Sequence, residues 1–420
     1  MWINFAKVAA ACLLASPVLA GDPPPISVPQ VPDVKPLGAA PSGNPFSEPF
    51  FAPPGGAPVM DKWRPGSGAE QGDLLTPPAP APFRPERVWF AGDFYHSVGQ
   101  GTLLPPLVTT STNGTGALNE PTTRIVFGGE RALNRFRPGL RANAGLWLTD
   151  DYRFGIDGTI IYTGDVSSEF RATTNPAGPV LSRPVFLGNF GTQVGVPVGA
   201  FAPGSISASA HSAVIGGDVN FRYGWKTSEL GRLDVLVGYR YMNLRDNVDV
   251  STRSEFAVNP IGGLTAAIGD FTVSDHFRTL NQFHGGQIGL GGTHRLFGRL
   301  TLTTKATVAV GVNITDVSID GRTTSIFGTT KGGLLTGENN IGNTRENYFS
   351  VMPEATAKLG WDFTDRVRLN AGYSFLFWTN VRRAADQIDT TIQFPNRPAF
   401  LDDTTTYWLQ GWTVGLDLRW

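Results

Sequence analysis

The sequence of 420 residues is short of several residue types on which soluble proteins depend. Charged residues make up only 16%, against roughly 25% in an ordinary soluble domain. A surface fully exposed to water would therefore have few charged side chains to keep it soluble. Cysteine occurs once and methionine four times, and no run of 18 apolar residues exists, which excludes transmembrane helices. The formal net charge of −1 excludes a basic nucleic-acid-binding protein. The chain is instead rich in glycine (51), proline (32) and phenylalanine (27).

The first 20 residues have the pattern of a secretory signal peptide. Lys7 precedes a short apolar stretch, and the small side chains of Val18 and Ala20 occupy the −3 and −1 positions of a cleavage point after Ala20. A buried N-terminal helix is the alternative interpretation. The single cysteine, Cys12, lies inside this segment, so the mature chain is predicted to have no disulfide, catalytic thiol or cysteine-bound metal.

Residues 21–86 form a second zone, rich in proline, glycine and alanine, in which no alternation of apolar and polar residues is present. Proline removes backbone donors and favours extended geometry, so this zone predicts a disordered periplasmic linker. A peptide ligand for an aromatic groove and a tether to the cell wall remain alternatives.

From residue 88 onward, apolar residues alternate with small or polar ones. In the stretch 366–377, Leu369, Tyr373 and Phe375 fall on one face, whereas Arg368 and Asn370 fall on the other. Such alternation is typical of strands whose two faces meet different solvents. The runs extend over about 10 to 16 residues, longer than the roughly 5 to 6 of soluble strands and sufficient for the 9 to 11 that cross a membrane. A secreted β-sandwich is the alternative.

The pattern therefore predicts an all-β fold, a transmembrane antiparallel up-and-down β-barrel over 87–420 with about ten strands. Long and short connections alternate between these strands, as they do in outer-membrane barrels, and an even number of strands places both ends in the periplasm. Two further strands are possible at 123–129 and within 164–207, which would give twelve. The ten predicted strands are 88–97, 139–149, 152–163, 208–225, 233–246, 276–294, 299–317, 347–363, 366–379 and 404–420.

Aromatic residues fall into two outward groups near the strand ends, as expected for the two girdles of a membrane barrel. The C-terminal segment ends in alternating apolar residues and an aromatic, with Gly415, Leu418 and Trp420 as the marks of an outer-membrane insertion signature. The two groups are Tyr152, Phe154, Tyr223, Trp225, Trp361, Phe363 and Trp420 at the periplasmic rim, and Tyr162, Tyr239, Tyr241, Tyr373, Phe375 and Phe377 at the extracellular rim.

The opposite strand face carries the charged residues, so these are predicted to line the lumen. Seven are basic and five acidic, which indicates a mixed lining in a narrow bore. Two functions stay open: a narrow, weakly selective pore for small solutes, and a closed structural or surface-interaction barrel whose loops or linker bind partners. The predicted lining is Arg141, Asp157, Asp218, Arg222, Asp234, Arg240, Lys305, Glu354, Lys358, Arg368, Asp417 and Arg419.

Signals for catalysis, metals and cofactors are weak, and the protein is expected not to be an enzyme. Asp275 and His276 are the best candidates for an acid–base pair in a hydrolase at the rim, but neighbours on a strand point to opposite faces. Asp402 and Asp403 fall short of the 6 to 8 oxygen ligands that calcium needs. The expected partners are outer-membrane lipid, the outer-membrane assembly machinery, and small solutes or cell-wall components, with no nucleic acid.

Several longer segments resemble the beta-barrel porin-7 family of bacterial outer-membrane proteins, over 88–420. The resemblance implies an integral, porin-like barrel of the bacterial outer membrane, and it transfers no catalytic residue. Polar residues in these segments, namely Asn281, Gln282, Arg382, Asp386 and Asp389, are predicted to fold inward and constrict or cap the barrel. The matching segments are 105–111, 181–184, 277–287, 332–335, 353–354, 372–378, 386–389 and 408–411.

Overall fold

The computed structural model describes residues 86–174, 177–199, 203–258, 266–325 and 328–420. The predicted signal peptide and all but the last residue of the predicted linker lie outside these residues. Within the described residues no helix is long and apolar enough to cross a membrane. The helical part of these residues is a single 3₁₀ turn, η1 (Ala385–Gln387).

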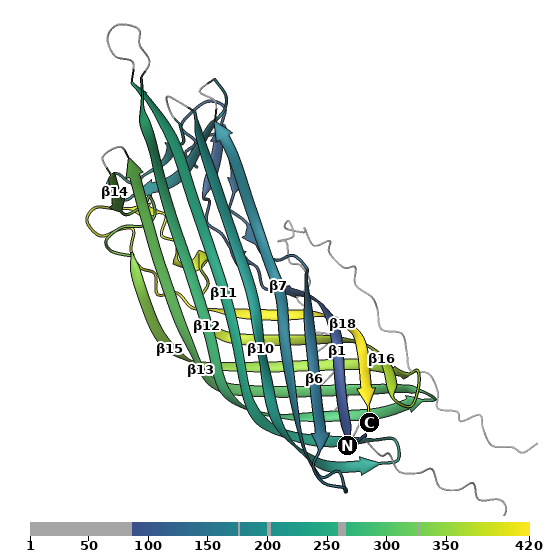
Figure 1. Cartoon of the computed structure of the whole chain (residues 1–420). Helices are drawn as coiled ribbons and strands as arrows, with labels where there is room; N and C mark the ends of the chain where they lie inside the picture. The colour runs from purple at the N-terminus through teal and green to yellow at the C-terminus, as the bar shows by residue number, and fades with distance from the viewer. Residues whose placement is uncertain (1–85, 175–176, 200–202, 259–265, 326–327) are drawn as a thin grey trace, which may run out of the picture. The chain divides into compact units, whose positions relative to one another are not determined.

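Ten long strands pair in chain order, each antiparallel to its neighbours, and the last pairs with the first to close the ring (Figure 1). This arrangement confirms the predicted ten-stranded up-and-down barrel. The junction of the first and last strands, with Trp89 opposite Arg419, is called the seam below. The wall consists of β1 (Val88–Gly99), β6 (Arg137–Trp147), β7 (Phe154–Thr174), β10 (Gly204–Ser228), β11 (Gly231–Val258), β12 (Ala266–Phe297), β13 (Leu300–Ser325), β15 (Gly342–Asp362), β16 (Val367–Val381) and β18 (Thr405–Arg419).

The two ends of the barrel differ in their connections. At one end, here the turn end, the strands are joined by the short segments 148–153, 229–230, 298–299 and 363–366. At the other, here the loop end, they are joined by 100–136, 175–203, 259–265, 326–341 and 382–404. The turn-end connections have 2 to 6 residues and four of the loop-end connections have 16 to 37, in agreement with the predicted alternation, whereas 259–265 has only seven because β11 and β12 continue beyond their predicted ends.

The outer face of the wall carries an apolar belt. Every second residue of a strand points outward, and in the strand middles these residues are large and exposed, as at Val219, Ile288 and Val308. An exposed apolar surface of this extent is unfavourable in water and suits the hydrocarbon of a bilayer. Exposed aromatic residues extend this surface toward the turn end, among them Phe154, Tyr223, Trp225, Trp361, Phe363 and Trp420.

Several strands continue well beyond their predicted ends on the side of the loop end, namely β7, β11, β12 and β13 (Figure 1). The prediction ended each strand where its outward residues stop being apolar, but the backbone pairing does not stop there. On β11 the outward residues become Arg245, Asn247 and Asp249, while the inward Val248 and Val250 stay buried. The part of the wall toward the loop end, here the upper wall, thus has a polar outer face and an apolar inner face. The strands stay paired there because their inner face still covers a hydrophobic core.

The two possible extra strands, within 123–129 and 164–207, do not join the ring, so the twelve-stranded alternative is wrong. They belong instead to a small second sheet, made by segments that are far apart in the chain, which shares a hydrophobic core with the inner face of the wall. This sheet and the loops around it, within 100–136, 177–199, 328–341 and 382–404, are called the cap. The second sheet consists of β3 (Val108–Ser111), β4 (Thr123–Phe127), β8 (Val180–Leu187), β9 (Thr192–Pro197) and β17 (Thr391–Ile392); short pairings involve β2 (Thr102–Leu103), β5 (Arg131–Ala132) and β14 (Gly328–Lys331).

Candidate functional site

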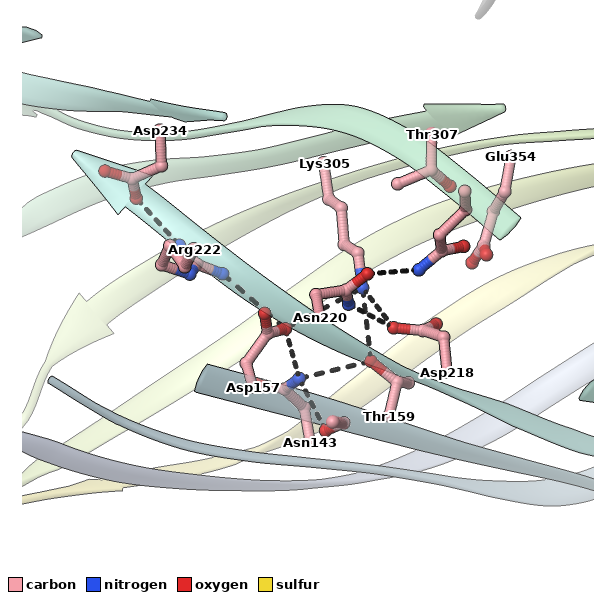
Figure 2. A network of polar contacts seen from close by, with 12 residues as sticks. Asn143, Asp157, Thr159, Asp218, Asn220, Arg222, Asp234, Lys305, Thr307 and Glu354 are labelled. Atoms are coloured by element: carbon pink, nitrogen blue, oxygen red, sulfur yellow. Dashed lines mark hydrogen bonds and ion pairs between the residues drawn. The ribbon is translucent and has the colours of Figure 1, made fainter. Parts of the chain in front are cut away.

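The predicted lining residues meet one another across the interior of the barrel. Arg141 on β6 and Glu354 on β15 are separated in the wall by β1, β18 and β16, yet their side chains are 2.7 Å apart. Lys305 on β13 likewise approaches Asp218 on β10, at 2.8 Å between Nζ and Oδ1 (Figure 2). Contacts between strands that are not neighbours have to pass through the lumen, so the mixed charges pair inside it.

Glu354 lies at the centre of this network. Its carboxylate accepts hydrogen bonds from Arg141 and Arg240, and only 3% of its side chain is exposed. Arg240 also lies 3.2 Å from Asp218, which in turn binds Lys305. Each charge of this group therefore has an opposite charge within ion-pair distance, which offsets the cost of its burial.

Neutral polar side chains connect the charged ones (Figure 2). The Asn143 amide donates to Asp157 at 3.4 Å and to the Thr159 hydroxyl at 3.1 Å. Asn220 donates to Asp218 at 2.6 Å and accepts from Gln287. These amides take up hydrogen-bonding capacity that the ion pairs leave over, and they hold the carboxylates in place.

Toward the turn end, Arg222 lies between Asp157 at 3.6 Å and Asp234 at 2.8 Å. Its guanidinium also faces the rings of Trp89 and Trp147, at 5.4 and 5.8 Å from their centroids. Such aromatic faces stabilise a cation. A cavity of about 170 Å³ adjoins this group.

The remaining predicted lining residues lie nearer the turn end, where each has a partner of its own. Lys358 pairs with Asp93, a residue that was not predicted to line the lumen. Arg368 and Arg419 both bind Asp362 at 2.7 Å, and Arg419 also binds Glu86 at 2.6 Å. Asp417 accepts a hydrogen bond of 2.6 Å from Asn370.

The residues of the predicted insertion signature lie on the last strand at the seam. Trp420 is exposed, and its backbone exchanges hydrogen bonds of 2.9 and 3.1 Å with Val88. Leu418 is half-buried, opposite Phe90. Gly415 faces inward, where a Cβ atom would lie 2.2 Å from the Gly92 carbonyl oxygen and 2.4 Å from the Asp93 carboxylate. Glycine is therefore needed there by the close approach of β1.

Beyond the ion pairs, toward the loop end, the lumen is filled by an apolar layer. Along β11 the inward residues run Arg240, Met242, Leu244 and Asp246, so apolar side chains follow directly on the charged network. All the residues of the layer are between 0 and 3% exposed. These residues were not among those predicted to line the lumen, because only charged residues were assigned to the inward face. The layer consists of Tyr95, Ile161, Val214, Met242, Leu244, Phe283, Ala309, Met352, Leu376, Trp378, Val381, Tyr407 and Leu409.

A second polar level follows above the apolar layer, and loop residues enter it as predicted. Asn281 exchanges two hydrogen bonds of 2.8 Å with the backbone of Arg382. Arg382 and Asp389 are buried, and Asp386 is half-buried. The prediction was wrong for Gln282, which faces the outside and donates to the Tyr241 hydroxyl, because it is the strand neighbour of the inward Asn281.

Two carboxylates of this level have shifted pKa values. Hydrogen bonds from Tyr348 and Arg382 lower the pKa of Glu346 below its usual range. Burial raises the pKa of Asp386, a change that nearby Arg383 partly opposes. Arg383 itself pairs with Asp246 on β11, which ties the loop 382–404 to the wall.

Asp275 and His276 point to opposite faces of the wall, as their adjacency on a strand predicts. His276 lies on the outside, where its Nδ1 is 2.6 Å from Oδ1 of Asp249 on the neighbouring strand. Asp275 is inside and pairs with Arg183 of the cap. The two residues therefore belong to two different environments.

A closed antiparallel wall with an apolar belt outside and charges inside defines a porin-like β-barrel of the bacterial outer membrane. The family model described as "Putative beta barrel porin-7 (BBP7)" matches residues 89–420, and the chain belongs to this family, which confirms the resemblance seen in the sequence. A search of curated proteins gave no match.

The chain also has a weak similarity to solved structures. The outer membrane protease OmpT from Escherichia coli is similar at a TM-score of 0.39 and 11% identity, covering 80% of this chain and 97% of that one. A FadL homologue of Pseudomonas aeruginosa is similar at a TM-score of 0.22 and 9% identity, covering 80% and 90%. At this level the likeness carries no inference about activity.

Proposed function

We propose that the protein is a closed, non-enzymatic barrel of the outer membrane that anchors the cap at the cell surface. The observation that carries this proposal is the apolar layer, whose 13 side chains are at most 3% exposed. An ion or polar solute passing this level would have to leave its water against side chains that are mostly apolar, which is unfavourable.

The paired charges below the apolar layer support the same conclusion. A selectivity filter needs charged or carbonyl groups that can exchange their partners for the passing ion. Here Glu354 is already held by two arginines, and Asp218 by Arg240 and Lys305. These contacts give the interior a structural role, which is to brace strands that are not neighbours in the wall.

The orientation follows from the two ends of the barrel. Outer-membrane barrels keep short turns in the periplasm and long loops outside, so we infer a periplasmic turn end and an extracellular cap. The termini of the barrel segment, near Val88 and Trp420, then face the periplasm. The belt suits lipid as a partner, the C-terminal signature suits the assembly machinery, and the proline-rich zone 21–86 suits a contact with cell-wall components.

The narrow, weakly selective pore predicted from the sequence is the second candidate. Its support is the cavity of about 170 Å³ among the charged residues, which is lined by Arg141, Lys305, Lys358 and Asp417 among others. For this cavity to conduct, the apolar layer would have to move aside. The two functions therefore differ in one measurable property, the conductance of the resting barrel.

Single-channel recording in a planar bilayer tests the proposal. Refolded full-length protein, shown to be folded by its heat-modifiable migration on gels, should stay silent. A variant with Phe283→Ser, Met352→Ser and Leu376→Ser should conduct, because water can enter the lumen once the layer is polar.

The control changes the outward neighbours on the same three strands, Gln282→Ser, Val351→Ser and Phe377→Ser, and should be silent. Steady ohmic steps from the unchanged protein would refute the closed barrel and support the pore. Silence from the inward variant, when it is folded and inserted, would show that the apolar layer is not the barrier.

A further inference from the structure

The outer face of the upper wall carries two arginines just above the apolar belt. Arg245 on β11 and Arg278 on β12 are the first fully charged residues that these strands present outward above the belt, and both are exposed. Arg245 lies opposite Leu280, and Arg278 lies opposite Asn247, so the two arginines are diagonal neighbours on paired strands. Long side chains at diagonal positions come within reach of each other. The two guanidinium groups can therefore bind one ligand together.

Neither arginine has a side-chain partner among the residues that the structure describes. No ion pair or hydrogen bond in this part of the chain involves the side chain of Arg245 or Arg278. Other outward arginines of the upper wall differ, because Arg253, Arg322 and Arg345 each pair with a carboxylate. Since the first two arginines are exposed, their donors are accessible to a group from outside the protein.

The charges nearby leave this region positive. On β13 the adjacent carboxylate is that of Asp316, which pairs with Arg345 of β15 at 3.6 Å. On the other side Arg245 lies opposite Ala213 of β10, and Asp165 lies one strand further away, on β7. Three arginines therefore face a single carboxylate next to the belt. Outward carboxylates further from the belt have partners of their own, among them Asp249 with His276 and Asp320 with Arg322.

The position of the two arginines at the edge of the belt indicates the kind of ligand. Tyr239 on β11 is half exposed below Arg245, at a level where aromatic rings lie among lipid headgroups. Val312 on β13 adds exposed apolar surface beside it. A lipid packed against this surface holds its headgroup at the height of the arginines. Basic groups that adjoin a membrane-spanning segment attract anionic headgroups.

Two guanidinium groups without a carboxylate match an anion with two charges. A phosphate monoester carries nearly two negative charges and three oxygens that accept hydrogen bonds from the planar set of arginine donors. A phosphodiester carries one charge. We propose that Arg245 and Arg278 bind the phosphate monoester of a membrane lipid whose chains lie on the adjoining belt. The proposal goes beyond the closed barrel, because it requires only that the belt lies in a bilayer, and it holds whether or not the lumen conducts.

Native mass spectrometry of the full-length protein in non-ionic detergent tests the proposal, with dioleoyl phosphatidic acid as the probe at pH 8, where the monoester is doubly charged. We expect one phosphatidic acid per chain, bound about tenfold more tightly than dioleoyl phosphatidylglycerol, a diester with the same chains. Arg245→Gln with Arg278→Gln should weaken the binding of phosphatidic acid about tenfold, because charge-assisted hydrogen bonds are lost. Both side chains are exposed, so this variant should fold, which heat-modifiable migration on gels verifies.

The matched control, Arg253→Gln with Arg322→Gln, removes the same charge from the outer face at arginines that already have carboxylate partners. It should bind phosphatidic acid as the unchanged protein does. Inorganic phosphate at the concentration of the lipid should not displace it, because free phosphate has no chains to pack on the belt.

Three results would overturn the proposal. Binding that survives Arg245→Gln with Arg278→Gln, or that weakens equally in the control, would show that the two arginines form no site. Phosphatidylglycerol bound as tightly as phosphatidic acid would remove the preference for a monoester. Displacement by inorganic phosphate would show that the ligand is a free anion and not a lipid.

Discussion

Glu354→Gln tests whether the ion-pair network holds the barrel together. The change removes a charge that two arginines share, Arg141 at 2.7 Å and Arg240, while the size of the side chain stays nearly the same. Arg240 keeps Asp218 at 3.2 Å, but Arg141 is left buried without its carboxylate. Removing one partner of a buried pair costs about 3–5 kcal/mol. Since the glutamine oxygen still accepts one hydrogen bond, we expect about 3 kcal/mol.

The matched control is Asp320→Asn, which breaks a pair on the outer face of the same barrel. Asp320 and Arg322 are 3.6 Å apart, with side chains 46% and 68% exposed, so their pairing is expected to contribute about 0–1 kcal/mol. Urea titration of protein refolded into phospholipid vesicles, followed by tryptophan fluorescence, gives the free energy of unfolding of each variant. The slopes of the titrations should agree, because the surface exposed on unfolding does not change.

A double variant separates the loss of the charge pair from other effects. Arg141→Met with Glu354→Gln should be more stable than Glu354→Gln alone, because the uncompensated guanidinium is gone. A loss under about 1 kcal/mol for Glu354→Gln would refute the reasoning. It would mean that water in the neighbouring cavity solvates Arg141 and that the network is not a brace.

Further predictions concern the wall and the cap. Val308→Lys puts a charge into the belt and should cost about 2–4 kcal/mol and impair assembly in vesicles, whereas inward Lys305→Gln should still yield folded, heat-modifiable protein. Gly415→Ala, whose Cβ would meet the Gly92 carbonyl, should cost about 1–3 kcal/mol, whereas Gly286→Ala, with nothing within 4 Å, should leave the urea midpoint unchanged. The pKa of Asp386 is raised in the folded protein, so its ionised form destabilises the cap, and stability should rise as the pH falls from that pKa toward about 3.9. Asp386→Asn should remove this part of the pH dependence, measured as proteolysis of the loop 382–404, and equal pH profiles would contradict it.

The wall was predictable from the sequence because lipid imposes a strict pattern on it. A strand with hydrocarbon on one side must present residues such as Val308 and Val310 outward, and its polar residues, such as Lys305, can then only face inward. This pattern gave the number of strands, their order and their phase. It also placed the ends of several strands too early. Beyond the apolar belt the outward residues are polar, such as Asp249 and Arg253, so the alternation of apolar and polar residues is lost although the strand continues.

The apolar layer and the cap could not be found in the same way. In the layer, Met242 and Leu244 point inward, and their outward neighbours are polar or aromatic. The sequence pattern that assigns apolar residues to the outer face therefore does not reveal that these two face the lumen. The strands of the cap are short and pair over long separations, as Thr109 does with Ser182. Pairing of this kind depends on the whole chain and has no local signal.

The partnership of Asp275 with Arg183 was missed for a related reason. The sequence placed Asp275 next to His276, and the expectation of opposite faces was correct, but what lies on the inward side depends on how the cap folds. Arg183 reaches it from a segment 92 positions away in the chain. The pairing therefore became visible only once the cap and the wall were seen together.

The seam between β1 and β18 has a consequence for how the chain assembles. Its two strands come from opposite ends of the barrel sequence, so their pairing closes the longest loop in the molecule and is entropically the most demanding step. The interior contacts of Asp93 with Lys358, Arg141 with Glu354 and Arg137 with Tyr407 all bridge the two sides of this seam. In an open sheet these groups would be hydrated and apart. We therefore expect the pairing of β1 with β18 and the removal of water from the lumen to be coupled.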